Sequence, residues 1–502
     1  MLKSRVIADP DFTVASLDRR VFGTFVEHLG RCVYGGIYEP GHPTADENGF
    51  RRDVLDLTRE LGVTIVRYPG GNFVSGYNWE DGVGPKEERP VRLDLAWGST
   101  ETNQFGTNEF IDWCRLAELE PMFAVNLGTR GPAEAQQFLE YCNHPGGTHY
   151  SDLRRSHGYE APHDIKFWCL GNEMDGPWQT CSKTAQEYGR VAAETAKMMR
   201  WTCDGLELAA CGSSHLDMPT YAAWEYTVLD HCFEQVDYIS LHQYFRNDDD
   251  DIARYLTAVD HLQAFITEVT AIADAIAAKR RSSKRIMLSL DEWNVWYKSH
   301  HGEHLRKPGW PQAPDLLDEI YNFEDALVIG GALITIMNNA DRVKSACLAQ
   351  LVNAIAPILT ETGGPAWRQT IFHPFAQAAR WGRGEVLRAK VVTDSFSAGK
   401  YPSAPMLVTS ILHDPDTGAL TVFALNRSLD EEMTLDVELR GMGARMLGEA
   451  HELHHEDLKA INSKEEPDEV APAAHPRAGF EEGVLRAVLK PLSWNVFVTW
   501  PQ

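Results

Sequence analysis

Short apolar runs alternate with longer amphipathic stretches up to about residue 355 of the chain. The runs are continuously apolar rather than alternating, which is typical of parallel strands covered on both faces. They lie at residues 21–29, 63–71, 121–129, 165–173, 206–214, 236–244, 285–293 and 343–353. The stretches between them, such as residues 107–120 and 184–201, have helical periodicity. Eight strand–helix repeats predict a closed (β/α)8 barrel, the TIM-barrel fold.

The pattern changes after about residue 380. Segments that alternate between apolar and polar positions, such as residues 406–414 and 433–442, are separated by turn signals, which predicts an antiparallel β-sandwich of jelly-roll type. The early segment 3–18 is a candidate to add a strand to it, and residues 462–479 read as a long polar loop within it. We therefore expect a barrel over residues 19–375 and a sandwich built from residues 1–18 and 376–502.

Each of the eight barrel runs begins apolar and ends polar. The polar ends carry Glu27 and His28, Arg67, Asn126, Asn172 and Glu173, Ser213 and Ser214, His242 and Tyr244, Glu292, and Gln350 and Asn353. In a barrel of this kind the carboxyl ends of all strands converge on one face, and that face holds the active site. These residues are far apart in sequence, but the fold predicts that they are neighbours.

Glu173 and Glu292 are the candidate catalytic residues. Glycoside hydrolysis needs two carboxyl groups, one that protonates the leaving oxygen and one that attacks or activates water. A single glutamate at a strand end is more simply a salt bridge or a cap. Two of them, each inside its own polar group at the same predicted mouth, favour catalysis.

Four further strand-end residues have candidate roles beside this pair. Asn172 is suited to hold a sugar hydroxyl, although it could instead satisfy loop backbone. Arg67 can keep a carboxylate ionised by a charge-assisted bond, which differs little from an internal salt bridge. His242 and Tyr244 lie two apart on a strand, so they share a face and could orient the carboxylates; a satisfied core histidine is the alternative.

Tryptophans cluster near the predicted strand ends. They are Trp97, Trp178, Trp293, Trp296 and Trp310. Sugar faces carry C–H groups that pack on aromatic rings, although any single tryptophan is more often part of the core. Trp97 and Trp178 lie in Gly/Pro-flanked loops after strand ends, so we favour these two as cleft residues, whereas Trp168 within its strand is expected to pack.

Composition narrows the class of partner. The 502 residues are 43% hydrophobic and 24% charged, as in a soluble globular protein, and the net charge of −25 argues against nucleic acid while suiting a neutral partner such as a sugar. The start has no apolar segment of signal-peptide length, and no window reaches the ~18 apolar residues of a membrane span. The nine cysteines lack CxxC spacing and read as reduced, buried thiols of a cytoplasmic protein.

Several other motifs indicate no metal and no cofactor. The histidine-rich runs 299–304 and 451–456 match no zinc spacing and read as solvated loops. The stretch YPGGN at 68–72 lacks the framework of a nucleotide site, so its glycines more simply let backbone pass close to a substrate. The acidic run 247–251 reads as a solvated turn.

Long segments of the chain resemble one enzyme family. FVEHLGRCVYGGIYEP, RYPGGNFVSGYNWEDGVGP, WCLGNEMDGPWQ, YISLHQY, LDEWNVWY, CLAQLVNAIAPI and DLKAINSKEEPDEVAP are similar to segments of the α-L-arabinofuranosidases of glycoside hydrolase family 51. The resemblance covers nearly the whole chain. It implies a retaining, exo-acting hydrolase that removes terminal non-reducing α-L-arabinofuranosyl units from arabinan or arabinoxylan oligosaccharides.

The resemblance also implies roles for single residues. Glu173 matches the general acid/base and Glu292 the nucleophile; Glu27, Asn72, Asn172 and Gln350 match residues that grip the sugar hydroxyls; and Arg67, His242 and Tyr244 match residues that set the charge and orientation of the pair. Such enzymes are typically cytoplasmic homo-oligomers, often hexamers, without a required metal. A retaining route predicts carboxyl groups ~5 Å apart and a raised pKa for Glu173.

Two alternatives stay open at this point. One is a related barrel glycosidase with another substrate, such as an endo-β-glucanase or a β-xylosidase; an endo-acting enzyme should have an open cleft, and an exo-acting one a closed pocket for one sugar. A non-catalytic carbohydrate-binding protein would not need both Glu173 and Glu292. The loop 299–312 is a candidate to shape the leaving-group side, so the linkage preference is open as well.

Overall fold

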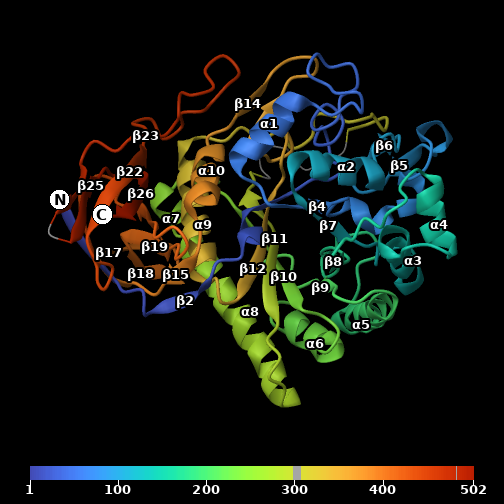
Figure 1. Ribbon diagram of the computed structural model, residues 1–502, viewed down its shortest axis with the longest axis horizontal. Helices are drawn as coiled ribbons and strands as arrows, with labels where there is room; N and C mark the ends of the chain where they lie inside the picture. Colours follow the sequence, from blue (N-terminus) through green and yellow to red (C-terminus); the bar gives the residue numbers. More distant parts are fainter. Residues whose placement is uncertain (298–306, 482) are drawn as a thin grey trace.

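The computed structural model describes residues 1–297, 307–481 and 483–502, and its centre is a closed parallel barrel (Figure 1). Its eight strands are neighbours in chain order, and the eighth pairs with the first. They are β3 (Gly23–Phe25), β4 (Ile65–Tyr68), β7 (Glu120–Ala124), β8 (Phe167–Leu170), β9 (Glu207–Ala210), β10 (Tyr238–Phe245), β11 (Met287–Val295) and β12 (Val343–Ala349). Each predicted run overlaps one of these strands, so the predicted barrel is confirmed.

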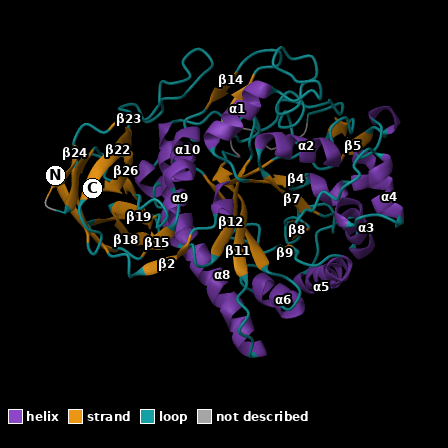
Figure 2. Ribbon diagram, in the orientation of Figure 1, coloured by secondary structure: helices purple, strands orange, loops and turns teal. Residues whose placement is uncertain are grey.

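Helices surround the barrel on its outer side (Figure 2). They are α1 (Arg52–Leu61), α2 (Thr107–Ala117), α3 (Pro132–Asn143), α4 (His149–Ser156), α5 (Ala185–Thr202), α6 (Ala223–Cys232), α7 (Ile252–Tyr255), α8 (Ala258–Arg280), α9 (Phe323–Asn338) and α10 (Phe372–Trp381). At least one helix follows every barrel strand, which gives the eight strand–helix repeats that the sequence predicts.

Local sequence explains where these helices begin and end. The hydroxyl of Thr184 accepts a bond from the Glu187 backbone N–H at 3.3 Å, and the Glu187 carboxylate accepts one from the Thr184 N–H at 2.9 Å, which caps α5. The predicted helix 107–120 ends three residues early. Glu118 adopts a left-handed conformation (φ 60°) and Glu120 already begins β7.

Short elements occupy the loops between the larger ones. They are η1 (Arg19–Phe22), η2 (Phe73–Gly76), η3 (Trp79–Gly82), η4 (Lys86–Glu88), β5 (Arg92–Asp94), β6 (Ser99–Glu101), β13 (Ile358–Thr360) and β14 (Ala366–Arg368). The pairs β5–β6 and β13–β14 each form a two-stranded sheet.

The second body is a strand-rich sandwich that holds both chain termini (Figure 1). One sheet has the order β16-β1-β21-β25-β24 and the other β2-β15-β19-β20-β26-β22-β23. The strands are β1 (Leu2–Ala8), β2 (Thr13–Ser16), β15 (Glu385–Leu387), β16 (Lys390–Val392), β19 (Leu407–His413), β20 (Leu420–Asn426), β21 (Met433–Leu439), β22 (Arg445–Leu453), β23 (Ala473–Ala474), β24 (Ala478–Glu481), β25 (Val484–Leu489) and β26 (Ser493–Pro501).

Two expectations about the sandwich need correction. The N-terminal segment adds one strand to each sheet rather than a single strand, and β1 pairs in parallel with β21, so the sandwich is not purely antiparallel. The run 451–456 is only partly a loop, because residues 451–453 belong to β22. The run 299–304 lies outside the described residues.

A helix buried on all sides joins the two bodies. Residues 323–337 of α9 are all buried, because one face packs on β11 and β12 and the other on β19, β20 and β26. The main hydrophobic core therefore extends from the barrel into the sandwich, and a smaller core lies between the two sheets. The division of the chain at residues 375 and 376 stays a prediction.

All nine cysteines are free thiols, but not all are buried as expected. Seven are buried, whereas Cys181, in the loop before α5, is exposed and Cys203, which directly follows α5, is partly exposed. Within the described ranges, the model contains no helix that combines the length and apolarity a membrane crossing needs.

Candidate active site

A cavity of about 960 Å³ opens at the carboxyl ends of the barrel strands. Eight of the eleven predicted site residues line it: Glu27, Asn72, Trp97, Glu173, Trp178, Tyr244, Glu292 and Gln350. The other three, Arg67, Asn172 and His242, lie behind them, at most 2% exposed. The barrel therefore brings together every site residue that the sequence predicts.

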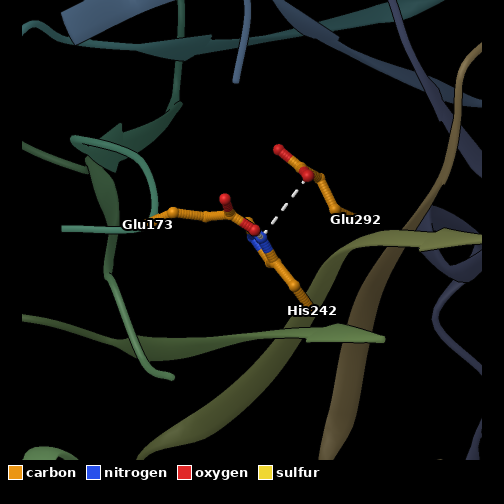
Figure 3. A group of neighbouring side chains, drawn as sticks. All are labelled: Glu173, His242 and Glu292. Atoms are coloured by element: carbon orange, nitrogen blue, oxygen red, sulfur yellow. Dashed lines mark hydrogen bonds and ion pairs between the residues drawn. The ribbon is translucent and has the colours of Figure 1, made fainter. Parts of the chain in front are cut away.

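His242 stands between the two candidate catalytic carboxylates (Figure 3). Its Nδ1 lies 3.0 Å from Oε1 of Glu173 and 3.4 Å from Oε2 of Glu292. One carboxylate oxygen of each glutamate and a ring nitrogen of His242 all lie within 4.8 Å of one another. The other ring nitrogen, Nε2, lies 2.9 Å from Oδ1 of Asp291, a carboxylate that sequence reasoning did not single out.

A β-bulge lets two consecutive residues of β11 face the same histidine. Successive side chains of a strand point to opposite faces, so Asp291 and Glu292 should diverge. However, Ser240 of β10 is opposite Ser289 while His242 is opposite Glu292, so β11 contains one extra residue there. The register with β12 shifts over the same segment. The bulge re-aims the side chains, which brings both carboxylates to His242.

Arg67 of β4 binds the side chains of both Glu292 and Asn172. Its Nη1 donates to Oε1 of Glu292 and its Nη2 to Oδ1 of Asn172, both at 2.7 Å. Its Nε lies 4.0 Å from Oδ2 of Asp291, and the guanidinium packs over the ring of Phe25. This bidentate arrangement fixes Glu292 and Asn172 relative to each other.

The cluster contains three carboxylates and two cations. Burial alone would lower the pKa of His242, but the charges and hydrogen bonds of Glu292, Asp291 and Glu173 raise it to about 10. Burial raises the pKa of Glu292, and so does Glu173, whereas His242 and Arg67 act in the opposite direction. With His242 protonated, one proton shared by the two glutamates makes the cluster neutral, which is the state that a buried site favours.

Hydrogen bonds from Arg67 and Tyr244 favour the ionised form of Glu292. Glu292 accepts from the Arg67 guanidinium and, at 3.0 Å, from the Tyr244 hydroxyl. Glu173 accepts from the Trp178 indole N–H at 2.6 Å and contacts His242. The bonds from Arg67 and Tyr244 stabilise the ionised form of Glu292.

A fourth buried carboxylate, Glu27, lines the cavity. It accepts from the Phe73 backbone N–H at 2.9 Å, from the Trp97 indole at 3.0 Å and from the Gln350 amide at 2.9 Å. Burial and the nearby charge of Glu292 raise its pKa to about 8, against these hydrogen bonds. Glu27, Trp97 and Gln350 thus present a polar surface suited to a hydroxylated ligand.

The loop after β4 passes directly beside these carboxylates. A Cβ atom on Gly71 would lie 2.8 Å from Oε1 of Glu292, so only glycine fits at this place. The glycines of residues 68–72 are expected to let the backbone pass close to a substrate. In the structure, the backbone at Gly71 passes close to the carboxylate of Glu292. Asn72, the next residue, is half-buried and lines the cavity.

Some of the tryptophans near the strand ends line the cavity, and others are buried in the core. Trp178 is 45% exposed and stacks near His215, with ring centroids 6.2 Å apart. Trp168 is fully buried, as predicted, and so is Trp293. Trp296 also lines the cavity, which sequence reasoning did not favour.

Some of the polar residues predicted at the strand ends form hydrogen bonds in loops or separate clusters and do not line the cavity. The Asn126 side chain accepts from the backbone N–H groups of Gly128 and Thr129 and so closes its own loop. Asn353 accepts from the Thr360 N–H, and His28 lies 2.8 Å from Glu101 in a separate buried cluster. Ser213 donates its backbone N–H to a buried glutamate, Glu225.

Sequence reasoning missed Asp291 and named Trp296 without favouring it as a cleft residue. Both lie within five residues of Glu292, and Asp291 directly precedes it. A carboxylate next to a catalytic carboxylate was the available signal, but strict strand alternation would place it on the far face. Residues 299–306 of the loop expected to shape the leaving-group side lie outside the described residues.

The three residues of Figure 3 are also the one group among the described residues whose side chains could together hold a metal ion. The raised pKa of His242 argues for a proton there instead. A protonated imidazole has no lone pair to offer a metal, and it neutralises the carboxylates itself.

Comparison with known proteins agrees with this geometry. The family model described as "Alpha-L-arabinofuranosidase 1 domain" matches residues 57–262, and the one described as "Alpha-L-arabinofuranosidase C-terminal domain" matches residues 291–493.

Full-length relatives extend the match to nearly the whole chain. An intracellular exo-α-(1→5)-L-arabinofuranosidase from Halalkalibacterium halodurans is 53% identical over 99% of this chain and 98% of its own. An exo-α-(1→6)-L-arabinofuranosidase from Bifidobacterium longum is 48% identical over 98% of this chain and 96% of its own. The solved structure of a family 51 α-L-arabinofuranosidase from Bifidobacterium longum superposes with a TM-score of 0.95 at 44% identity, covering 99% of both chains. The chain therefore belongs to glycoside hydrolase family 51, the family of the α-L-arabinofuranosidases.

Proposed function

We propose that this protein is a retaining exo-α-L-arabinofuranosidase that hydrolyses terminal non-reducing α-L-arabinofuranosyl units of oligosaccharides. The observation that carries the proposal is the pair Glu173 and Glu292, held around His242 at the inner end of the cavity. The names of the relatives support the sugar, and the geometry supports the mechanism.

In the first step, Glu292 acts as the nucleophile. Its ionised carboxylate, held by Arg67 and Tyr244, attacks the anomeric carbon of the arabinofuranosyl unit. Glu173 donates its proton to the leaving oxygen as the glycosidic bond breaks. The products are a covalent ester between the sugar and Glu292 and a free leaving group.

In the second step, Glu173 acts as a base. Now ionised, it takes a proton from a water molecule, which attacks the anomeric carbon from the side that the leaving group vacated. The ester bond to Glu292 breaks and arabinose leaves with its original anomeric configuration. His242, positive throughout, stabilises whichever glutamate is ionised, because it contacts both.

The separation of the carboxylates supports retention. Oxygens of Glu173 and Glu292 lie within 4.8 Å of each other. Retaining enzymes hold their carboxyl groups about 5–5.5 Å apart, whereas inverting enzymes leave about 6.5–9.5 Å for a water molecule between them. A distance within 4.8 Å between one oxygen of each carboxylate favours the retaining arrangement.

Polar groups at the inner end of the cavity are suited to the sugar hydroxyls. Glu27, Asn72 and Gln350 line the cavity with one carboxylate and two amides, Trp97 lies beside Glu27, and the amide of Asn172 lies just behind them. Asn172 is fixed by Arg67, so it is pre-oriented for a hydroxyl next to the reacting carbon.

The substrate linkage, location and assembly are proposed on the relatives alone. Relatives at 53% and 48% identity are named for α-(1→5) and α-(1→6) linkages, so arabino-oligosaccharides with these linkages are the substrates to test first, followed by the arabinoxylan oligosaccharides that the family resemblance implies. Relatives from Halalkalibacterium halodurans and Bacillus subtilis are named intracellular, which supports a cytoplasmic location. A homo-oligomer, with a hexamer as the first candidate, is expected from the family.

The test is release of nitrophenol from 4-nitrophenyl α-L-arabinofuranoside by the wild type and by Glu292→Gln. We expect rapid turnover by the wild type and a loss of several powers of ten in kcat for the variant, since removal of a nucleophile costs about 10⁴–10⁶-fold in comparable enzymes. The anomer released first, followed by proton NMR, should be the α form.

A second variant separates the two glutamates. In Glu173→Ala, added azide should restore turnover and yield the glycosyl azide with retained configuration, because azide needs no base to attack the ester on Glu292. Release of the β anomer would exclude the double displacement. A wild type that hydrolyses only glucosides or xylosides would leave the carboxylate pair intact and contradict the proposed sugar.

A further inference from the structure

The cavity that holds the carboxylate pair is larger than one sugar unit needs. Its volume of about 960 Å³ is at the upper end of the range of about 300–1,000 Å³ for sites that enclose a whole drug-sized ligand. Its walls run from Glu173 and Glu292 in the barrel to Gly399, Lys400 and Tyr401, which belong to the second body of the protein.

These three residues form the tip of a hairpin that leaves the sandwich. Its strands β17 (Ser395–Ala398) and β18 (Tyr401–Pro405) make a two-stranded sheet of their own between β16 and β19 in sequence. The tip contacts the start of α8 and the segment before it. The Tyr401 hydroxyl lies 3.4 Å from Nδ1 of His261, and Gly399 lies against the side chain of Arg254.

A buried arginine fixes the hairpin to the barrel. Arg427, at the end of β20, has a fully buried side chain. Its Nη1 donates to Oδ2 of Asp260 at 2.6 Å and to the Leu256 carbonyl at 3.1 Å, both in or next to α8. Its Nε donates to the carbonyl of Pro405 in the hairpin at 2.8 Å, and its guanidinium packs over the ring of Phe396. The hairpin is therefore held at a set position over the cavity, as a binding wall requires.

Aromatic rings from both bodies line the cavity. Trp178, whose indole donates to Glu173, lies nearly parallel to His215 with an interplanar angle of 10°, and Tyr401 lines the cavity from the hairpin. A polar lining with a few aromatic faces is suited to sugar rings, whose C–H faces pack on aromatic groups while their hydroxyls bind polar ones.

Two arginines along the outer part of the cavity are paired with aspartates, and the other charged residues there, Lys400 and Asp217, are of opposite sign. Arg246 lies 2.9 Å from Asp248, and Arg254 forms an ion pair with Asp249, so the acidic run 247–251 is matched by two arginines. A site for an anionic ligand would instead offer cations that the protein does not itself neutralise. The arrangement favours a neutral ligand.

We propose that the β17–β18 hairpin is the outer wall of a leaving-group site for a neutral oligosaccharide longer than one unit, with Tyr401 as its aromatic contact. The sandwich thereby takes part in substrate selection. The inference rests on the proposed function, because the ligand is the part of the substrate beyond the cleaved bond.

The test compares substrates of different length in the full-length protein. The substrates are 4-nitrophenyl α-L-arabinofuranoside and arabino-oligosaccharides of two and of four units, in whichever of the α-(1→5) and α-(1→6) linkages the wild type cleaves faster. We expect the wild-type kcat/KM to be about tenfold higher for four units than for two, since one aromatic contact contributes up to about 1.5 kcal/mol.

Tyr401→Ala should remove that advantage. We expect the ratio of kcat/KM for four units to kcat/KM for the nitrophenyl substrate to fall about tenfold, mainly through KM. Tyr226→Ala is the matched control, because Tyr226 is a tyrosine of α6 that is 41% exposed and does not line the cavity. The control should keep the wild-type ratio.

Three outcomes would contradict the proposal, and they differ from one another. Equal wild-type kcat/KM for two and four units would overturn it without any variant. An equal fall on all substrates in Tyr401→Ala would show that the hairpin acts on folding and not on the ligand. A wild type inactive on every arabinofuranoside, but active on another glycoside, would overturn the proposed function first and this inference with it.

Discussion

At the scale of single residues, the site is governed by one histidine among three carboxylates. His242 contacts Glu173, Asp291 and Glu292, and Asp291 is the one of the three that lies away from the cavity. A carboxylate that does not reach substrate but binds the imidazole from behind controls the charge of the whole group. We therefore treat Asp291 as a positioning residue whose effect is electrostatic.

Asp291→Asn should shift the pH dependence of the reaction. Removal of a negative charge lowers the pKa of every ionisable group around it, including the proton shared by Glu173 and Glu292. The basic limb of the kcat/KM profile, where that proton is lost, should move to lower pH by about one unit. The measurement is kcat/KM on the nitrophenyl substrate from pH 4 to pH 10 in steps of half a unit.

Stability gives an independent reading of the same change. The pKa of His242 is raised to about 10 from an ordinary value of 6.5, so its ion pairs contribute stability that is fully present below about pH 6.5 and lost as the pH rises through about 10. In Asp291→Asn this alkaline loss of stability should begin at lower pH. The measurement is the midpoint urea concentration of unfolding as a function of pH.

Asp325→Asn is the control, because Asp325 is a buried carboxylate in α9 that binds Tyr255 and Tyr297. Asp325→Asn should reduce stability and leave the basic limb of the kcat/KM profile in place. If the basic limb also stays in place in Asp291→Asn, the electrostatic role of Asp291 is refuted.

At the scale of elements, the loop between β4 and η2 sets the geometry of the nucleophile. Its backbone passes so close to Glu292 that the Cβ of Gly71→Ala would lie 2.8 Å from Oε1, the oxygen that Arg67 holds. The carboxylate must then turn away from its partners. A displacement of about 1 Å at a reacting group lowers the rate about 100-fold, so we expect that loss in kcat for Gly71→Ala on the nitrophenyl substrate.

The same loop offers a matched control. Gly76, five residues later, has open space where a Cβ would stand, with no atom within 4 Å. Gly76→Ala should therefore keep kcat within about twofold and change the free energy of unfolding by less than about 1 kcal/mol. If both variants lose activity alike, the loop as a whole and not the contact at Gly71 is responsible.

The elements also show what a sequence can predict and what it cannot. All eight barrel strands are predictable because parallel strands are apolar on both faces, and the polar residues at their ends meet because the fold carries every carboxyl end to one face. The bulge in β11 is not predictable in this way. Its extra residue is set by the register against β10 and β12, and no local pattern of residues 287–295 records it. Asp291 was missed for that reason.

A second limit concerns loops that act far from their own element. The hairpin β17–β18 has ordinary turn and strand signals, which place it in the sandwich. Its position at the barrel mouth depends on the bond between Arg427 and Asp260, two residues 167 positions apart. Contacts of this kind arise only in the folded chain, so sequence reasoning left the sandwich without a role.

At the scale of the whole molecule, the two bodies share one core. Trp494 of β26 is fully buried, stacks on Phe423 of β20 with ring centroids 5.6 Å apart, and belongs to the same apolar cluster as the barrel. Its indole N–H donates to Oε1 of Gln377 in α10 at 2.7 Å. Interfaces between independent domains are usually smaller and more polar, and they permit separate unfolding. A shared core predicts that barrel and sandwich unfold together.

Calorimetry of the wild type should therefore show a single transition, with activity lost at the same temperature. Trp494→Phe keeps an aromatic ring but leaves the Gln377 oxygen buried without its donor, which costs about 1–3 kcal/mol. The single transition should move down by a few degrees and stay single. Trp201→Phe, on α5 and 81% exposed, is the control and should leave it in place. Two transitions, of which only one moves in Trp494→Phe, would mean that the sandwich unfolds by itself, and the outer wall of the cavity could then be lost while the carboxylate pair stays assembled.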